Sequence, residues 1–243
     1  MKKIKGEDYE INLEKMPKEN SVIIEGFPGL GFVSTIVCDY LIKHLDAEYI
    51  GYIFTKKLLP FATIHQDKVV QPIQIFYDEK NNIVIINTYT SFEGIEYDIA
   101  EIILEFAKKI KARQIISIEG ITSLEEPSEK IYFFSTQKKE EKKLIEKGFE
   151  KIKEGVIIGV TGALLLRTEN FPFLGLFVEV HGEMPDNRAS ALIIKALDSY
   201  LGLEVDYKPL LKKAEEIEEK IRSLIEKIIK AGEEKKKRIS YTG

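Results

Sequence analysis

Short apolar runs alternate with longer amphipathic segments along most of the chain. The runs are rich in Ile and Val, end at Gly, Asn or charged residues, and predict strands. The predicted strands are Val22–Ile24, Ala47–Thr55, Val69–Tyr77, Asn82–Thr90, Gln114–Glu119, Lys130–Ser135, Gly155–Val160 and Leu174–Val180. Apolar residues spaced by about 3.6 positions predict helices at Phe32–Leu45, Tyr97–Ile110 and Arg188–Leu201. This alternation indicates one α/β domain over residues 1–205, with a mostly parallel sheet covered on both faces.

The pattern changes after Lys208-Pro209. From there, apolar residues recur in steps of four and three, which is the a/d pattern of a heptad repeat. The seam consists of Leu210, Ala214, Ile217, Ile221, Leu224, Ile228 and Ala231. Charged residues surround it, as on a solvated helix. We therefore expect an amphipathic heptad helix over residues 206–232, whose seam forms an oligomer or partner interface, and a flexible basic tail over residues 233–243.

Two placements of this helix are compatible with the pattern. Either the helix folds back onto its own domain, or it projects and pairs with copies of itself or with another protein. Some 30 residues at 1.5 Å each give a helix of roughly 45 Å, which is longer than a small domain is wide. This length favours projection.

The charge balance and the hydropathy exclude two classes of function. The formal net charge is -4, with 36 basic and 40 acidic residues, so we expect no nucleic-acid partner. No apolar run approaches the roughly 18 residues of a membrane span, so we expect a cytoplasmic protein with no membrane partner. The single cysteine, Cys38, has apolar helix neighbours and is predicted to be a core residue.

The stretch IEGFPGLGFVST (residues 24–35) places a glycine-rich turn between a predicted strand and a predicted helix. Gly26 and Gly31 have the spacing of the glycines in a nucleoside triphosphate-binding P-loop, but Phe32-Val33 stands where that motif requires Lys-Ser/Thr. Without the lysine, nucleoside triphosphate hydrolysis is rejected. An anion at the helix N-terminus remains an alternative. We favour a structural role, in which the glycines permit a tight strand-to-helix crossing.

Candidates for catalysis are few and dispersed. The three histidines, His44, His65 and His181, lie far apart, and no metal-binding motif is present. His181 and Glu119 follow predicted strands, where open α/β sheets place their active sites. Other acidic residues near strand ends are Glu93, Glu179, Glu183 and Asp186. We predict no catalytic, cofactor-binding or metal-binding residues. The alternative is an enzyme with its site near Gly29–Gly31, Glu119 and His181.

The order of motifs resembles the archaeal branch of the proteasome assembly chaperone family. Members carry an apolar strand, then G-[FW]-P-G-x-G, then a helix ending in D/E-Y-L-I-x-x-L, then a strand containing I-G. Here the match runs through Gly26, Pro28, Gly29, Gly31, Tyr40, Leu41, Ile42, Leu45 and Gly51. Ile118-Glu-Gly120, Gly159–Gly162 and Gly182-Glu-Met-Pro-Asp186 are also similar. The resemblance covers about residues 20 to 205.

The resemblance implies an α/β/α sandwich similar to nucleoside phosphorylases, without an established catalytic site. It also implies a homo-oligomer of about four or five subunits. Some archaeal relatives dock on proteasomes through a C-terminal hydrophobic–Tyr–any tripeptide. This chain departs from that pattern, because Tyr241 is third from the end and follows Ser240. Ile239, Tyr241 and Gly243 are nevertheless the residues we expect to dock.

Three hypotheses follow. The first is a non-enzymatic, homo-oligomeric assembly factor, scaffold or adaptor, whose partner is a proteasome α-subunit or another protein client. The second is an enzyme of nucleoside-phosphorylase-like fold that acts on a nucleoside or a carboxylate-amine substrate. The third is a plain oligomeric domain whose partner is unrelated to proteasomes. The heptad seam favours the first.

Overall fold

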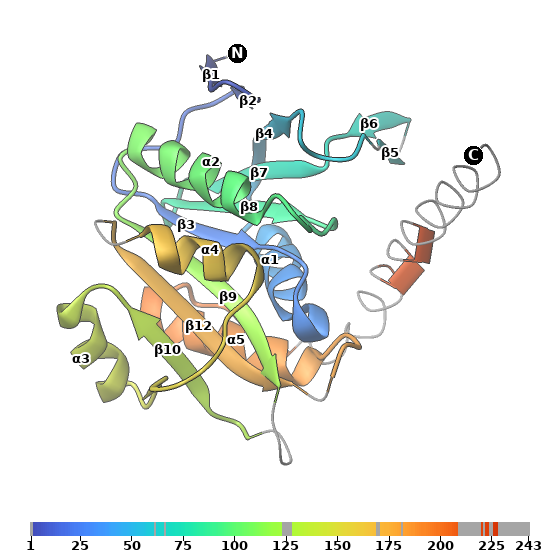
Figure 1. The fold of residues 1–243 in the computed structure, drawn as a ribbon. Coiled ribbons are helices and arrows are strands. Elements are labelled where there is room, and N and C mark those ends of the chain that lie inside the picture. Colours follow the sequence, from blue (N-terminus) through green and yellow to red (C-terminus); the bar gives the residue numbers. More distant parts are fainter. Residues whose placement is uncertain are drawn as a thin grey trace.

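The computed structural model describes residues 2–60, 62–65, 67–122, 128–168, 171–180 and 182–208, together with 220, 222, 223, 226 and 227. Ten strands of this part form one sheet: β1 (Lys2–Lys5), β2 (Tyr9–Leu13), β3 (Val22–Gly26), β4 (Glu48–Thr55), β7 (Ile73–Asp78), β8 (Ile83–Thr88), β9 (Gln114–Thr122), β10 (Ile131–Ser135), β11 (Glu150–Lys151) and β12 (Phe173–Val180). Their spatial order is β1-β2-β4-β7-β8-β3-β9-β12-β10-β11 (Figure 1). A separate hairpin pairs β5 (Thr63–His65) with β6 (Lys68–Val70).

The sheet is mixed, so the prediction of a mostly parallel sheet is wrong. The central strands β8, β3, β9 and β12 pair with one another in parallel, and so does the short edge pair of β10 and β11. From β1 through β8 every neighbouring pair is antiparallel. The reason lies in the connections: a four-residue turn joins β7 to β8, whereas a parallel pair needs a longer crossover. The parallel centre therefore directs the carboxyl ends of β3, β9 and β12 to one edge.

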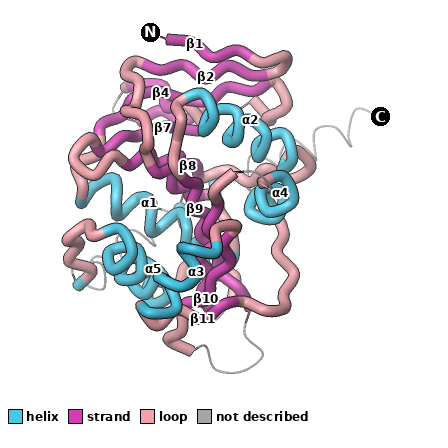
Figure 2. Tube along the Cα trace, turned by 90° about the vertical axis from the view of Figure 1, so that its left-hand side faces the viewer, coloured by secondary structure: helices cyan, strands magenta, loops and turns pink. Residues whose placement is uncertain are grey.

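Helices cover both faces, which confirms the predicted three-layer α/β/α architecture. They are α1 (Val33–His44), α2 (Glu96–Lys109), α3 (Lys138–Glu146), α4 (Gly159–Arg167) and α5 (Asn187–Leu201). Helices α1, α3 and α5 lie on one side of the sheet, and α2 and α4 lie on the other (Figure 2). None of the helices in the described part is long and apolar enough to cross a lipid bilayer.

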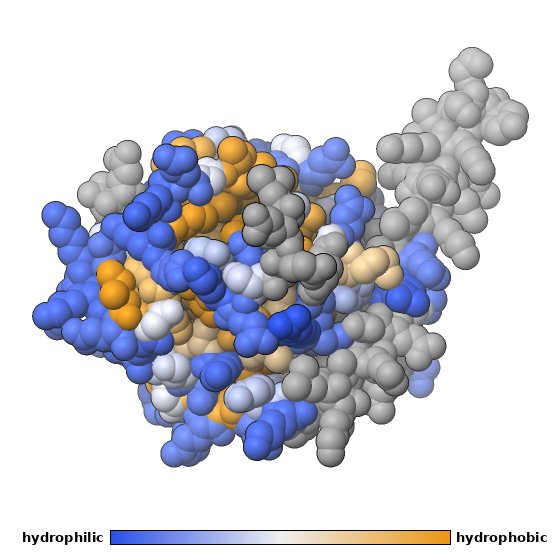
Figure 3. All heavy atoms as spheres, turned by 90° about the horizontal axis from the view of Figure 1, so that it is seen from below, coloured by the Kyte–Doolittle hydropathy of each residue, from blue (hydrophilic) through white to orange (hydrophobic). Residues whose placement is uncertain are grey.

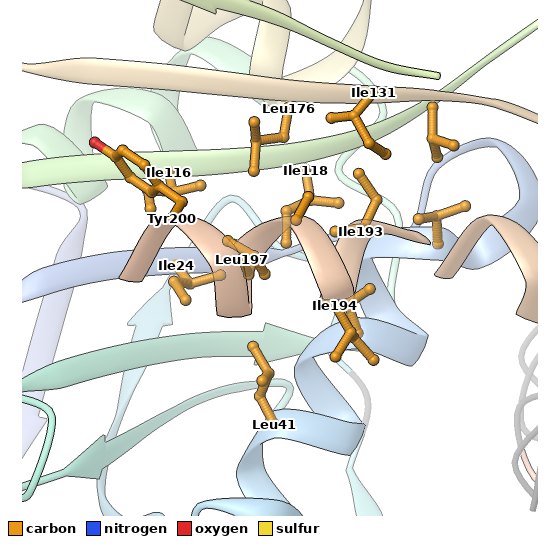
Figure 4. Close-up of a cluster of buried hydrophobic side chains, with 14 of the residues drawn as sticks. Ile24, Leu41, Ile116, Ile118, Ile131, Leu176, Ile193, Ile194, Leu197 and Tyr200 are labelled. Atoms are coloured by element: carbon orange, nitrogen blue, oxygen red, sulfur yellow. The ribbon is translucent and has the colours of Figure 1, made fainter. Parts of the chain in front are cut away.

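Alternation along the strands supplies a core on each face. In β3, Ile24 faces α1 and α5, while its neighbour Ile23 joins the cluster beneath α2 and α4. Figure 4 shows part of the first core, with Ile116, Ile118 and Leu176 packed against α5. Cys38 of α1 is fully buried there, as predicted.

Two predicted strands differ from the structure. Gly155–Val160 is not a strand: Gly159 begins α4 with a φ of 72°, and residues 155–158 form an irregular approach to that helix. A short apolar run does not by itself distinguish a strand from a buried helical turn. Val69–Tyr77 is two strands, because Pro72 lacks the N–H group that a continuous ladder needs. The N-terminal strands β1 and β2 were not predicted.

The chain after α5 stays against the domain for several residues. Gly202 ends α5 in the left-handed conformation, and Leu203 and Val205 are buried. The hydroxyl of Tyr40 on α1 donates a hydrogen bond to the carbonyl of Asp206 at 2.5 Å. The chain is thereby held on the α1 side as far as Asp206.

Candidate functional site

The glycine-rich turn leads from the end of β3 to the start of α1. A short 3-10 turn, Leu30–Phe32, lies between them, and Gly31 (φ 64°) and Phe32 (φ 49°) both adopt the left-handed conformation. A Cβ atom added to Gly26 would lie 2.4 Å from Sγ of Cys38, and one added to Gly29 would lie 1.9 Å from Oε1 of Glu119. The glycines therefore permit close contact with α1 and β9, which is the structural role that the sequence favours.

Two carboxyl groups lie beneath this turn. Glu25, the last residue but one of β3, lies opposite Ser117 of β9. Glu119 follows two residues further along β9, so all three side chains point to the same face. The hydroxyl of Ser117 donates a hydrogen bond to Glu25. The hydroxyl of Thr161 on α4 lies 3.1 Å from Oε2 of Glu119 and 3.4 Å from Oε1 of Glu25. We call Glu25, Ser117, Glu119 and Thr161 the carboxyl cluster.

Burial raises the pKa of both carboxyl groups. Glu25 is almost completely buried, and its pKa lies well above the usual value, because of desolvation and the nearby charge of Glu119. Desolvation raises the pKa of Glu119 to about 7, against opposing hydrogen bonds from Thr161 and from the backbone of Leu30. The two groups therefore favour a state in which at least one carries a proton at neutral pH.

The carboxyl cluster uses the backbone donors that a bound anion would need. The backbone N–H groups of Phe27 and Leu30, both in the turn, donate to Glu25 and Glu119 respectively. A phosphate cradle requires such N–H groups to face its ligand. Here the protein's own carboxyl groups take these two positions, and the adjacent negative charge opposes a phosphate. A pKa near 7 is suitable for general acid–base chemistry, but the backbone of Gly29 covers the Glu119 carboxyl group closely.

The structure does not bring the other acidic candidates into this cluster. Glu179 accepts hydrogen bonds from the backbone of Ser128 at 2.7 Å and from Tyr132 at 3.2 Å. Asp186 caps α5 by accepting from the backbone of Ala189, and its own N–H donates to the carbonyl of Gly31. Glu93 and Glu183 are exposed.

Among the three histidines, His44 is the one whose side chain the structure describes. His44 stacks on Tyr40, with ring centroids 5.7 Å apart. His181 lies outside the described residues, and His65 is described only as part of β5. Within the described ranges, no group of three His, Cys, Asp or Glu side chains could hold a metal ion.

A second buried carboxyl group lies where the C-terminal segment meets the domain. Asp39 of α1 is buried and accepts hydrogen bonds from the hydroxyl of Tyr89 and from Nδ2 of Asn87 at 3.3 Å. Nζ of Lys220 lies 3.5 Å from Oδ2 of Asp39 and 5.6 Å from the ring centroid of Tyr89. Lys43, one turn along α1, approaches the same carboxyl oxygen at 3.6 Å. We call Asp39, Asn87 and Tyr89 the lysine socket.

The predicted seam itself lies outside the described residues. This applies to Leu210, Ala214, Ile217, Ile221, Leu224, Ile228 and Ala231, and also to the tail residues Ile239, Tyr241 and Gly243. Residues 220, 222, 223, 226 and 227 are helical, and Lys220 is the described member that reaches the lysine socket. A contact between the C-terminal segment and α1 is thus present, whereas the partner of the seam stays a prediction.

Removing the Lys220 ammonium group is expected to loosen this contact. Because Lys220 is half-exposed and Lys43 still compensates Asp39, a Lys220→Ala variant should lose at most about 1 kcal/mol of unfolding free energy. Amide hydrogen exchange in residues 220–227 should rise about two- to fivefold. Lys227→Ala, at an exposed position of the same segment, is the control and should leave exchange unchanged. Equal exchange in both variants would show that Lys220 does not anchor the segment.

Reasoning from the sequence did not identify Glu25 or Asp39. Glu25 is the charged residue in the otherwise apolar run VIIEG, and Ile24-Glu25-Gly26 has the same form as Ile118-Glu119-Gly120. Two such triplets on neighbouring parallel strands would have indicated a pair of carboxyl groups at one edge. Asp39 lies within the apolar stretch VCDYL of a helix, where a charge needs a partner.

Comparison with known proteins identifies the family. The family model described as "PAC2 family" matches residues 23–225. The chain belongs to the PAC2 family. The PAC2 match extends into the C-terminal segment, beyond the range of about 20 to 205 expected from the sequence motifs. The Methanocaldococcus jannaschii protein MJ0106, described as uncharacterized, is 32% identical over 221 residues, which is 89% of this chain and 90% of that protein.

Solved structures of similar proteins agree with the PAC2 assignment. Pyrococcus furiosus PbaA, described as an archaeal homolog of proteasome-assembly chaperone, is 31% identical with a TM-score of 0.79, covering 91% of this chain and 99% of PbaA. Pyrococcus furiosus PbaB, described as an archaeal proteasome activator, is 23% identical with a TM-score of 0.74, over 89% of this chain and 98% of PbaB. A Thermoplasma acidophilum protein of unknown function is 20% identical with a TM-score of 0.81, over 92% and 93% of the two chains. The last two show the fold alone. The predicted resemblance to archaeal proteasome-assembly chaperone homologues is confirmed.

Proposed function

We propose that this PAC2 protein is a non-enzymatic, homo-oligomeric assembly factor or adaptor, and that it acts on proteasome α-subunits through its C-terminal helix and tail. The observation that carries the non-enzymatic part is the covered carboxyl cluster, because the turn that resembles a phosphate cradle is occupied by Glu25 and Glu119. The likeness to PbaA, at 31% identity over nearly the whole of both chains, supports a proteasome-related partner.

Exposed apolar side chains provide surface for such contacts. Figure 3 shows a face on which hydrophobic residues are visible between many polar ones. Among the described residues, Val156 and Ile158 in the approach to α4 are 88% and 76% exposed, and Leu166 on α4 is also exposed. Another set lies at the hairpin, where Ile64 and Val69 are exposed. Where such side chains form a contiguous patch, the surface is typical of one that becomes buried in a complex.

The anchored base of the C-terminal segment supports its proposed role as the assembly element. Residues 203–206 pack on the domain, and Lys220 meets the lysine socket. The chain therefore has a fixed position on the domain before the predicted seam begins, which would help copies of the helix to meet in a defined geometry. The tail residues Ile239, Tyr241 and Gly243 would reach the partner, although Tyr241 is third from the end.

The mass of the protein in solution tests this proposal. The full chain is expected to form a single closed oligomer of about four or five subunits, and a chain that ends at Tyr207 is expected to form smaller species. A Leu224→Glu variant, which places a charge in the seam, should weaken the oligomer in the same way. Arg222→Glu, outside the seam, is the matched control and should leave the mass unchanged.

A binding assay with proteasome α-subunits follows. The full chain should bind the α-subunits, and the chain that ends at Tyr207 should not bind them. A monomeric full chain that binds no α-subunit would contradict the proposal, since the C-terminal helix would then serve only its own domain.

A further inference from the structure

A basic cavity opens at the edge of the sheet opposite the carboxyl cluster. It has a volume of about 340 Å³, within the range of roughly 300–1,000 Å³ that is usual for small-molecule sites. Its wall includes Gln114, the first residue of β9, together with the start of α3 and the end of α5. These three elements are far apart in the sequence, and the fold places them around one cavity.

The charges around this cavity favour an anion. Arg113, Lys139 and Lys143 line it, and Glu140 is the acidic residue among the lining side chains. Oε2 of Glu140 accepts a hydrogen bond from the hydroxyl of Tyr200 at 2.7 Å and lies 3.9 Å from Nζ of Lys143. Its negative charge is therefore partly compensated within the wall. Three cationic groups around one such carboxylate leave an excess of positive charge.

The side chain of Gln114, which belongs to the cavity wall, has an unused hydrogen-bond donor. Gln114 is 94% buried, its Oε1 lies 3.0 Å from the hydroxyl of Tyr200, and its Nε2 has no hydrogen-bond partner in the described part of the chain. A buried amide with unpaired N–H groups carries a free-energy cost that a ligand oxygen would remove.

Helix α3 adds further donors at the same place. Its cap residue, Gln137, makes no side-chain hydrogen bond to the helix, and Gln137 and Lys139 both line the cavity. The first N–H groups of a helix have no intrahelical acceptor and carry a partial positive charge. They supplement the cationic side chains and the amide of Gln114.

We propose that this cavity binds a small phosphate-bearing molecule, with Arg113, Lys139, Lys143 and the amide of Gln114 as donors to its phosphate oxygens. A guanidinium group, two ammonium groups and helix N–H groups match a doubly charged anion with several acceptor oxygens better than they match a single carboxylate. This site is independent of the seam and of the proposed proteasome partner, and it lies at the amino end of β9, away from the glycine-rich turn.

Calorimetric titration of the full-length chain with inorganic phosphate tests the site, with adenosine monophosphate as a second ligand. Saturable binding of both ligands would show that the cavity recognises the phosphate group itself. Binding of the nucleotide alone would assign a larger phosphorylated ligand. In Lys143→Ala the affinity should fall at least fivefold, whereas Lys142→Ala, at the adjacent position of α3 outside the cavity wall, should bind as the unaltered protein does. Arg113→Gln should give a similar loss of affinity, and it replaces Lys143→Ala as the test if Lys143→Ala does not fold.

Two results would overturn the proposal. The first is the absence of saturable heat with either ligand at constant ionic strength. The second is equal weakening by Lys143→Ala and Lys142→Ala, which would indicate unspecific attraction to a basic helix.

Discussion

A Gly120→Ala variant is expected to lose about 3 kcal/mol of unfolding free energy. A Cβ atom added to Gly120 would lie 2.3 Å from the carbonyl oxygen of Leu30 and 3.1 Å from Cγ1 of Val180. The first neighbour is backbone, so the clash cannot be relieved by rotating a side chain. Either the glycine-rich turn or strand β9 must move, and β9 is held between β3 and β12. The loss should appear as a lower urea midpoint with an unchanged slope.

Gly155→Ala is the matched control for this substitution. Gly155 is exposed, and an added Cβ atom would meet only the side chain of Ile152, at 3.2 Å. Its free energy of unfolding should change by no more than about 0.5 kcal/mol. If Gly120→Ala were as stable as Gly155→Ala, the turn would not press against β9, and the carboxyl cluster would be open to a ligand.

The sequence was sufficient to predict the parts of the fold that depend on local patterning. The central strands, three of the helices and the burial of Cys38 follow from the alternation of apolar and polar residues. The order and direction of strands did not follow, because pairing depends on contacts between distant residues. Strands β1 and β2 illustrate this: their outer residues are charged, and only pairing with β4 buries Ile11 and Leu13.

The candidate site likewise has one part that the sequence predicts and another part that depends on contacts between distant residues. The glycine-rich turn could be predicted because glycine spacing is visible in the sequence. Its contact with the carboxyl cluster could not, since Glu25 and Glu119 lie 94 positions apart and meet only because β3 and β9 are neighbours. Asp39 and Lys220 are a further example, because 181 positions separate them. The C-terminal seam was found from its heptad spacing alone, and its partner remains a proposal.

A Glu119→Gln variant is expected to be more stable than the unaltered protein at pH 8 and about equally stable at pH 5. The pKa of Glu119 is raised from 4.5 to about 7 in the folded protein. Between these values the folded state binds more protons than the unfolded state, so the free energy of unfolding falls as pH rises and is lowest above about pH 7. This shift corresponds to about 3 kcal/mol at full burial. Partial solvent exposure of Glu119 reduces the expected difference to about 2 kcal/mol.

The substitution isolates this effect because glutamine resembles the protonated acid in shape and in charge. At pH 5 the Glu119 carboxyl group is already neutral in the folded state, so the exchange should cost little. At pH 8 the variant avoids ionising a desolvated group, and it also removes the charge that raises the pKa of Glu25. Urea unfolding at the two pH values measures the difference, with Glu146→Gln, exposed on α3, as the control. An unchanged pH dependence in Glu119→Gln would mean that the Glu119 carboxylate is hydrated, and the closed turn that supports a non-enzymatic function would have to be abandoned.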